Sequence, residues 1–361
     1  MSCVKAIIDF DALLHNYSIA KNTAADARLY AVVKSAAYGH GLLKIAQALS
    51  IADGLAVARI EEAILLRQNN IRQAILVLAG VFHEVDLRRA CALGLELVVH
   101  SQAQIDLIIA DKNIAAMRGM KLWLKVDTGM HRLGFSPDQL SSVYAMLAAK
   151  LPSTTFILMT HLAKADQLGS KRSATQLKRL QKVILPGLAV SVANSAGILA
   201  WPETHADIVR PGIMLYGASP IQEKTAAELG LQPVMTLSSE LIAIKALRKG
   251  DHVGYGGEWI CPEKMQVGVV AIGYGDGYPR HAKAGTPVLI NGVLAPLVGR
   301  VSMDMICIDL RSLASAKVGD KVVLWGQGLA ADLIAGYADT IAYELFCGVT
   351  QRVEFSYVDR I

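Results

Sequence analysis

The sequence lacks the features that mark a membrane or secreted protein. No stretch reaches the roughly 18 consecutive apolar residues that a membrane helix needs. The first residues, Met1–Asp11, carry charged side chains where a signal peptide would have an apolar run. We therefore expect a soluble protein of the cytoplasm, without a membrane partner.

Cysteine is scarce, and its placement excludes the usual cysteine-based sites. The five cysteines are odd in number and scattered along the chain, and no two have the spacing of a metal site or a redox motif. Reduced thiols are the plain expectation in a cytosolic protein. No His, Asp and Glu cluster has metal-ligand spacing either, so we expect no metal and disfavour a metal-dependent barrel hydrolase.

The chain also lacks a concentrated charge of one sign. Its formal net charge is +5, and the basic residues are spread out, which argues against a nucleic-acid partner. A mildly basic protein would still attract an anionic cofactor. With 361 residues, of which 53% are hydrophobic, the chain can bury a large core and suits about two domains.

The first two-thirds of the chain alternates between two kinds of segment. Short runs rich in Val, Ile and Leu predict buried strands, and longer amphipathic runs predict helices. Eight such strands predict a (β/α)₈ barrel over residues 1–230. An open doubly wound sheet is the competing fold, but no Gly-rich fingerprint follows the first strand. The predicted strands are Leu29–Ser35, Gly54–Ile60, Ala74–Gly80, Leu95–His100, Lys121–Asp127, Thr155–His161, Ala189–Ser195 and Ala206–Gly212, and the predicted helices include Leu43–Ile51, Glu61–Gln68, Gln102–Ala110, Gln139–Ala149 and Ala174–Val183.

Residues 231–361 have a different texture, with short β-branched runs separated by turn signals such as Asn291-Gly292. This pattern predicts a mostly β second domain that contains one helix, Asp332–Tyr343. The predicted strands here include Met265–Ile272, Pro287–Ile290, Val293–Val298, Met305–Asp309 and Lys321–Trp325.

Polar side chains gather at the ends of the predicted barrel strands. Lys34 closes the first strand, Lys125 the fifth, His161 the sixth and Arg210 the eighth. Because the carboxyl ends of barrel strands meet at one face, we expect these groups to share a site. A lysine in an apolar strand must be desolvated, paired or covalently used, and burial makes an amine a better nucleophile. The strand pattern alone leaves open a surface lysine just past the strand.

The segment Lys34-Ser35-Ala36-Ala37-Tyr38-Gly39-His40-Gly41 resembles the cofactor-lysine signature of alanine racemases, and the resemblance extends over nearly the whole chain. It implies that Lys34 holds pyridoxal 5′-phosphate and that Tyr38 belongs to the cofactor site. The family usually carries Ala and then Asp or Asn where this chain has Ser35 and Ala36. A polar side chain beside the cofactor lysine is therefore missing.

The same resemblance assigns further barrel residues. The segment Lys125–Phe135 is similar to the one that supplies a substrate-binding arginine, here Arg132, whose planar fork suits a carboxylate. In the family Lys125 is often carbamylated and braces that arginine. His161 would lie against the cofactor ring, although a lone histidine at a strand end is more often structural.

The phosphate and the ring nitrogen have their own implied partners. The segment that begins at Asn194 implies that the Ser195 hydroxyl and the amides of Gly212 and Ile213 hold the phosphate, where close approach favours a small residue. Tyr343 would also contact the phosphate. Arg210 would face the pyridine nitrogen. An arginine can only donate, so the nitrogen stays unprotonated and the carbanion is less delocalised, which limits side reactions.

In the second domain, Val253–Gly257 resembles the segment that carries the second catalytic base, Tyr255. Racemisation needs proton transfer on both faces of the α-carbon, which two groups on opposite sides provide. In the family the tyrosine takes the proton of the L-enantiomer and the lysine that of the D-enantiomer. Tyr274, Met303 and Asp304 would line the substrate's access path. The family forms head-to-tail homodimers with composite sites, which implies a second copy as partner.

The sequence thus predicts an alanine racemase that uses Lys34 and Tyr255, either supplying D-alanine for peptidoglycan or degrading it. A racemase of broader substrate range stays open. A fold-related decarboxylase of basic amino acids would share the lysine, but the Tyr255 segment and Arg210 argue against it. A non-catalytic cofactor carrier would be barrel-only, unlike this chain.

Overall fold

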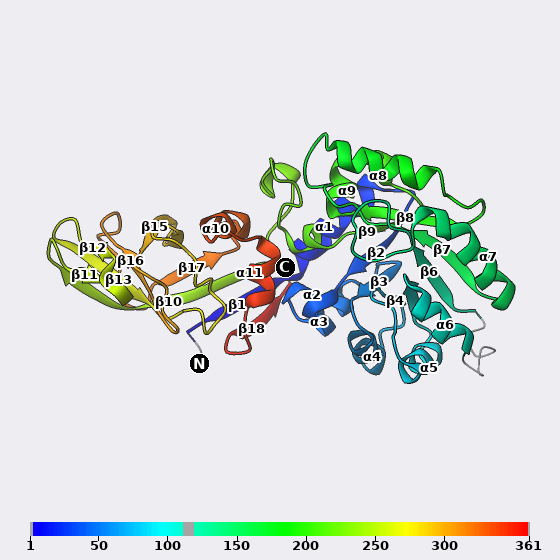
Figure 1. Cartoon of the computed structure of the whole chain (residues 1–361). Coiled ribbons are helices and arrows are strands. Elements are labelled where there is room, and N and C mark those ends of the chain that lie inside the picture. Colours follow the sequence, from blue (N-terminus) through cyan, green and yellow to red (C-terminus); the bar gives the residue numbers. More distant parts are fainter. Residues whose placement is uncertain (1–2, 111–118, 360–361) are drawn as a thin grey trace.

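A closed barrel of eight parallel strands forms one part of the molecule, and a β-rich part extends from it (Figure 1). The computed structural model describes residues 3–110 and 119–359. The predicted barrel is confirmed, with every predicted strand in place. The barrel strands are β2 (Arg28–Val32), β3 (Gly54–Val57), β4 (Ala74–Val77), β5 (Glu96–Val99), β6 (Lys121–Lys125), β7 (Thr155–Met159), β8 (Ala189–Asn194) and β9 (Ile208–Arg210).

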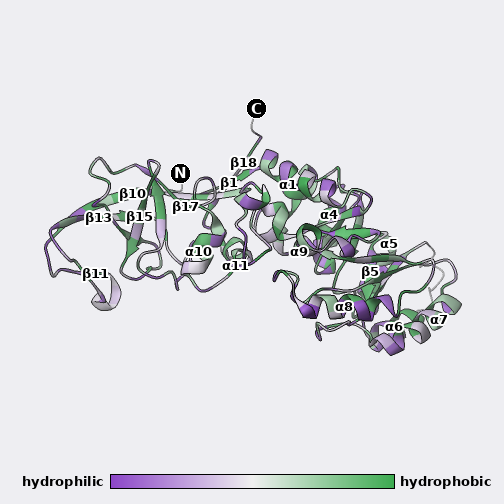
Figure 2. Cartoon of the chain, turned by 90° about the horizontal axis from the view of Figure 1, so that it is seen from above, coloured by the Kyte–Doolittle hydropathy of each residue, from purple (hydrophilic) through white to green (hydrophobic). Residues whose placement is uncertain are grey.

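Helices connect the barrel strands and surround them (Figure 1). Figure 2 shows α8 as a largely hydrophilic helix, and its buried positions include Leu177 and Leu180. These leucines, together with the buried Ser173 and Gln176, form the face that packs on the barrel, while most of the other side chains of α8 are partly or fully exposed. Within the described residues, no helix has both the length and the apolar character that crossing a membrane requires. The helices are α1 (Phe10–Thr23), α2 (Lys34–Tyr38), α3 (Leu42–Ala48), α4 (Ile60–Gln68), α5 (Glu84–Ala92), α6 (Gln102–Ala110), α7 (Leu140–Lys150), α8 (Lys171–Gln181) and α9 (Ser195–Ala200).

The β-rich part contains an eight-stranded sheet in the order β13-β16-β15-β14-β17-β10-β1-β18 and a small ribbon of β11 and β12. The mostly β prediction is confirmed. The strands are β1 (Lys5–Asp9), β10 (Met235–Leu247), β11 (His252–Val253), β12 (Trp259–Ile260), β13 (Met265–Val270), β14 (Pro287–Ile290), β15 (Val293–Val298), β16 (Ile306–Asp309), β17 (Lys321–Trp325) and β18 (Glu354–Val358).

The single helix predicted over Asp332–Tyr343 is wrong, because the chain forms two helices there. These are α10 (Ala331–Tyr337) and α11 (Ala342–Gly348). Asp339 adopts a left-handed backbone conformation with φ of 49°, which ends the first helix. The amide of Thr340 then donates to the carbonyl of Ala335 at 3.0 Å and closes α10 before α11 begins.

The first strand of the chain belongs to the sheet of the β-rich part. β1 pairs antiparallel with β10 and parallel with β18. The chain then enters the barrel at α1, where the Asp9 carboxylate accepts a hydrogen bond from the amide of Ala12 at 3.0 Å and caps the helix. The predicted domain boundary at Gly230 stays a prediction. Although β1 belongs to the predicted first domain, residues 1–230, it pairs with strands of the β-rich part.

A buried carboxylate organises the end of the barrel opposite the strands' carboxyl ends. Glu96 begins β5 and accepts hydrogen bonds from Tyr30 Oη at 3.1 Å and Trp123 Nε1 at 2.8 Å. Lys121 Nζ lies 2.8 Å from the same carboxylate and supplies the opposite charge. The network satisfies the polar atoms of two aromatic side chains that fill the barrel interior.

We predict that Glu96→Ala destabilises the barrel. The substitution leaves Tyr30 Oη and Trp123 Nε1 without their partner, and each lost bond to a buried group costs about 1–3 kcal/mol. The midpoint of thermal unfolding should fall by roughly 5–10 °C. Glu84→Ala, which removes an exposed partner of Arg88, is the control and should shift the midpoint little. Equal midpoints for both variants would contradict the network's importance.

Candidate active site

A cavity of about 320 Å³ opens at the carboxyl ends of the barrel strands. Most of the residues that the sequence predicts for the site line this one cavity, although they come from six different segments of the chain. They are Lys34, Tyr38, Lys125, Arg132, His161, Asn194, Ser195, Arg210, Gly212, Ile213 and Tyr343. The apolar remainder of the lining is Val32, Ala58, Leu78, Ala79, Leu133 and Met159.

Lys34 does not close the first strand, which corrects the prediction. The strand β2 ends at Val32, and Lys34 begins the short turn α2. Ser35, Ala36 and Ala37 all adopt left-handed conformations, with φ between 54° and 56°. Each non-glycine residue in that region costs about 1–2 kcal/mol, so local preference cannot account for the turn. Contacts from elsewhere must hold it.

The rear of this turn is fixed by packing. The Tyr38 ring stacks on Tyr216 with ring centroids 4.7 Å apart, and the Tyr343 ring lies tilted against it with centroids 5.8 Å apart. A side chain at Gly39 would collide with the carbonyl oxygen of Phe346 in α11, so only glycine fits there. α11 therefore docks on α2, between the two parts of the molecule (Figure 1).

Burial and like charge act together on the two lysines of the cavity. Burial lowers the pKa of Lys34, and the nearby Arg132 lowers it further, against a smaller opposing effect of Glu62. The pKa of Lys125 falls to about 8, through burial first and then through Arg132 and Arg210. Both amines therefore reach their neutral, nucleophilic form at a lower pH than an ordinary lysine.

Arg210 lies fully inside the barrel mouth. Its Nη2 donates to the carbonyl oxygens of Thr160 at 2.7 Å and Val192 at 3.1 Å, and its Nη1 donates to the Ser191 hydroxyl. Burial lowers the pKa of Arg210 to about 10, so the guanidinium is still charged at neutral pH. Burial, followed by this charge, holds the pKa of His161 well below its usual value, so the imidazole is neutral.

A set of backbone amides converges where β8 and β9 lead into their following turns. The Ser195 hydroxyl accepts from the amides of Gly212 at 2.8 Å and Met214 at 3.3 Å. A Cβ at Gly212 would lie 2.5 Å from Tyr38 Oη, so the glycine keeps this place open. Asn194 caps α9 by accepting from the amide of Gly197 at 2.9 Å. Such hydroxyl and amide donors suit a phosphate.

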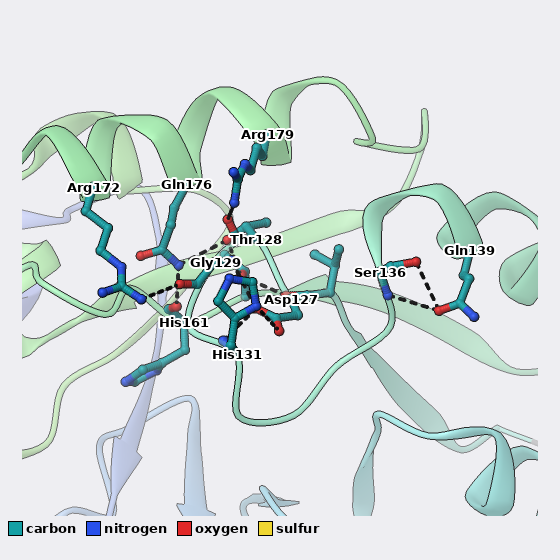
Figure 3. A network of polar contacts seen from close by, with 12 residues as sticks. Asp127, Thr128, Gly129, His131, Ser136, Gln139, His161, Arg172, Gln176 and Arg179 are labelled. Carbon is teal, nitrogen blue, oxygen red and sulfur yellow. Dashed lines mark hydrogen bonds and ion pairs between the residues drawn. The ribbon is translucent and has the colours of Figure 1, made fainter.

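The loop that carries Arg132 is held by a polar network (Figure 3). Asp127 accepts from the amides of Gly129 and His131, each at 3.0 Å. From α8, Arg172 and Arg179 donate to the loop carbonyls of Gly129 and Thr128 at 3.0 and 3.2 Å. The loop is thereby anchored at its base, while Arg132 itself reaches the cavity.

Of the five predicted site residues beyond residue 230, Tyr343 lines this cavity and the other four lie outside it. Tyr255 is 69% exposed at the ribbon of β11 and β12, and Tyr274 and Met303 are exposed as well. Asp304 pairs with Arg352 at 2.7 Å. Within one chain, the structure does not bring Tyr255 to Lys34.

Two supporting residues escaped the sequence-based prediction. Tyr216, which stacks on Tyr38, lies inside an apolar run and carries no signal that separates it from core. Gln176 donates to the carbonyl of His161 at 3.0 Å and to Thr128 Oγ1 at 3.2 Å. The available signal was a glutamine on the apolar face of a predicted amphipathic helix, because an amide that becomes buried there needs hydrogen-bond partners.

Two family models and many known proteins match this chain. The model of the alanine racemase N-terminal domain matches residues 8–220, and that of the C-terminal domain matches residues 234–357. An alanine racemase of Nitrosococcus oceani is 49% identical over 355 residues, covering 98% of this chain and 99% of that protein. One from Coxiella burnetii is 47% identical and covers all of both chains.

Solved structures agree over the full length. A biosynthetic alanine racemase from Pseudomonas aeruginosa superposes with a TM-score of 0.94 at 42% identity, covering 99% of this chain and 100% of that one. The alanine racemase of Acinetobacter baumannii superposes with the same TM-score at 38% identity and the same coverage. Matches of this extent in both sequence and fold show that the chain belongs to the alanine racemase family.

Proposed function

We propose that this chain interconverts L-alanine and D-alanine with pyridoxal 5′-phosphate, using Lys34 as one of two bases. The observation that carries the proposal is the single cavity that joins a buried amine of lowered pKa, a cradle of backbone amides and a buried guanidinium. The relatives that are named alanine racemases support alanine as the substrate.

The residues present fit the cofactor. The amides of Gly212 and Ile213, the Ser195 hydroxyl and Tyr343 would hold its phosphate, because hydroxyl and amide donors converge there around a glycine that leaves room. Lys34 would hold its aldehyde carbon. Among the lining residues of the cavity there is no carboxylate to repel an anionic group.

Arg210 would face the ring nitrogen and His161 the ring. Because Arg210 stays charged and can only donate, it would leave that nitrogen unprotonated. The cofactor, when bound, withdraws electrons from the substrate's α-carbon and makes its proton acidic. A weaker electron sink suits racemisation, which needs the proton returned before side reactions occur.

The proton is moved by two groups of this protein. Lys34 Nζ, neutral at a lower pH than an ordinary lysine, would take or return the α-proton on one face. Tyr255 would do so on the other face. Its exposed position, outside its own chain's cavity, supports a head-to-tail homodimer in which each site receives Tyr255 from a second copy.

Arg132 would bind the substrate carboxylate through its planar fork. Lys125 would brace it as a carbamate, formed when the neutral amine adds carbon dioxide and releases a proton. The lowered pKa of Lys125 supports this reaction, because more of the amine is neutral at physiological pH. A carbamate would also offset part of the positive charge that Arg132 and Arg210 bring into the cavity.

Tyr274, Met303 and Asp304 of the second copy would narrow the access path and favour alanine over larger amino acids. Comparable turnover of alanine and lysine would instead place the chain among racemases of broader range. We further propose that the dimer works in the cytoplasm.

Lys34→Ala should abolish both racemisation and the borohydride-fixed attachment of the cofactor, because one amine serves both purposes. Lys125→Ala is the matched control, since it removes the other low-pKa amine of the same cavity and should leave the attachment intact. The measurement is cofactor absorbance and peptide mass after borohydride treatment. Attachment that persists in Lys34→Ala, or that disappears in Lys125→Ala, would falsify the assignment.

Tyr255→Phe should lose racemisation in both directions but lose α-hydrogen exchange unequally. In deuterium oxide D-alanine should still exchange through Lys34, whereas exchange of L-alanine should fall by roughly 10²–10⁴-fold, the usual effect of a missing general base. Nuclear magnetic resonance of the recovered alanine measures both rates, after cofactor binding has been checked. Equal residual exchange from the two enantiomers would exclude Tyr255 as the second base.

Mixing two inactive variants tests the composite site. In a heterodimer of Lys34→Ala and Tyr255→Phe, one site carries both defects and the other combines an intact Lys34 with an intact Tyr255. Co-expression should therefore restore racemisation, while each variant alone stays inactive. A mixture that remains inactive although heterodimers form would mean that each chain supplies both bases of its own site.

A further inference from the structure

Glu62, in the first turn of α4, ties that helix to the turn that carries Lys34. Its Oε1 accepts a hydrogen bond from the amide of Ser35 at 2.6 Å. Its Oε2 accepts from the amides of Ala58 at 2.9 Å and Arg59 at 3.2 Å, just ahead of α4. One carboxylate thus joins the residue after Lys34 to the end of the neighbouring barrel strand.

Among the described residues, Glu62 makes the only side-chain hydrogen bond to the backbone of residues 34–36, and the backbone bond from the amide of Val33 to the carbonyl of Ala56 at 2.8 Å lies just before the turn. Ser35 and Ala36 are exposed, so their side chains do not pack into the core as Tyr38 does. Both are left-handed without being glycine. The bonds inside the turn, such as the one from the amide of Gly39 to the carbonyl of Ser35 at 2.9 Å, do not connect it to the barrel. The bond from Ser35 to Glu62 connects the exposed front of the turn directly to α4.

A carboxylate is suited to this place because all three groups around it are donors. An ionised glutamate only accepts, and it does so through both oxygens. A glutamine offers one acceptor and one donor, so its amide nitrogen would point at backbone N–H groups on one side. A glutamine of the same shape could therefore accept from the Ser35 amide or from the amides of Ala58 and Arg59, but not from both sides.

We propose that Glu62 is a positioning residue for Lys34, holding Ser35–Ala37 in the left-handed turn that directs the amine into the cavity. The proposal rests on the proposed function only in taking Lys34 as the reactive amine. Its effect should then be on the placement of Lys34 rather than on global folding.

The test uses the holoenzyme of four variants beside the parent. Glu62→Ala removes the link, and Glu62→Gln keeps its shape with a single acceptor. Glu61→Ala is the matched control, because it removes the adjacent exposed carboxylate, which makes no hydrogen bond or ion pair within residues 3–110 and 119–359. The double variant Glu62→Ala with Ala36→Gly supplies a residue that adopts positive φ without steric cost.

Two readouts are combined: backbone hydrogen exchange of residues 34–41 by mass spectrometry, and kcat for alanine. Glu62→Ala should speed exchange in this segment and lower kcat by roughly 10²-fold, the scale of a displaced catalytic group. Glu62→Gln should fall between it and the parent, and Glu61→Ala should match the parent. Adding Ala36→Gly should recover most of the lost kcat, because the turn then needs less support.

Exchange in Glu62→Ala that equals the parent's would overturn the proposal. So would a loss of kcat that Ala36→Gly does not recover, because Glu62 would then act only as a cap on α4. If the parent itself fails to racemise alanine, the proposed function fails while the exchange data still decide the role of Glu62. If Glu62→Ala does not fold, Glu62→Gln decides by the same two readouts.

Discussion

The seam where β2 pairs with β9 is the contact on which the site depends. Leu29 lies opposite Val209 in a parallel register, so both strands end at the same face although most of the barrel sequence separates them. Lys34 follows one strand and Arg210 ends the other. Without closure of the barrel, the amine and the guanidinium would belong to opposite edges of an open sheet, and no common cavity would exist.

Once closed, the barrel concentrates positive charge at one mouth. Lys34, Lys125, Arg132 and Arg210 line the same cavity, and none of its lining residues is acidic. Burial and mutual repulsion lower the pKa values of both lysines. The concentrated positive charge is unfavourable in an empty site, and it becomes favourable when the site binds a phosphate and a carboxylate. The same arrangement therefore favours a neutral amine at Lys34 and attracts anions such as the cofactor phosphate and the substrate carboxylate of the proposed reaction.

The position of Lys34 depends on segments that are far from it in the sequence. Its turn is left-handed at non-glycine residues, and it persists because Tyr38 packs on Tyr216 and because Gly39 meets the backbone of α11. α11 lies near the carboxyl end of the chain, so the β-rich part takes part in shaping the barrel mouth. A substitution in α11 outside Tyr343, for example at Phe346, can therefore act on the lysine that we propose as the reactive amine without changing the lining of the cavity.

The sequence by itself determined the eight barrel strands and the β-rich remainder, because strand and helix periodicity is local. Converging strand ends indicated part of the cavity, such as Lys34 and Arg210, and the resemblance to alanine racemases supplied others, such as Arg132 and Tyr343. Only the tertiary structure decided the left-handed turn at Lys34, the break at Asp339 and the pairing of β1 with β10 and β18. Each of these depends on contacts between distant segments, which override local preference. The placement of Tyr255 outside its own chain's cavity has the same origin, since periodicity carries no information on which surfaces meet.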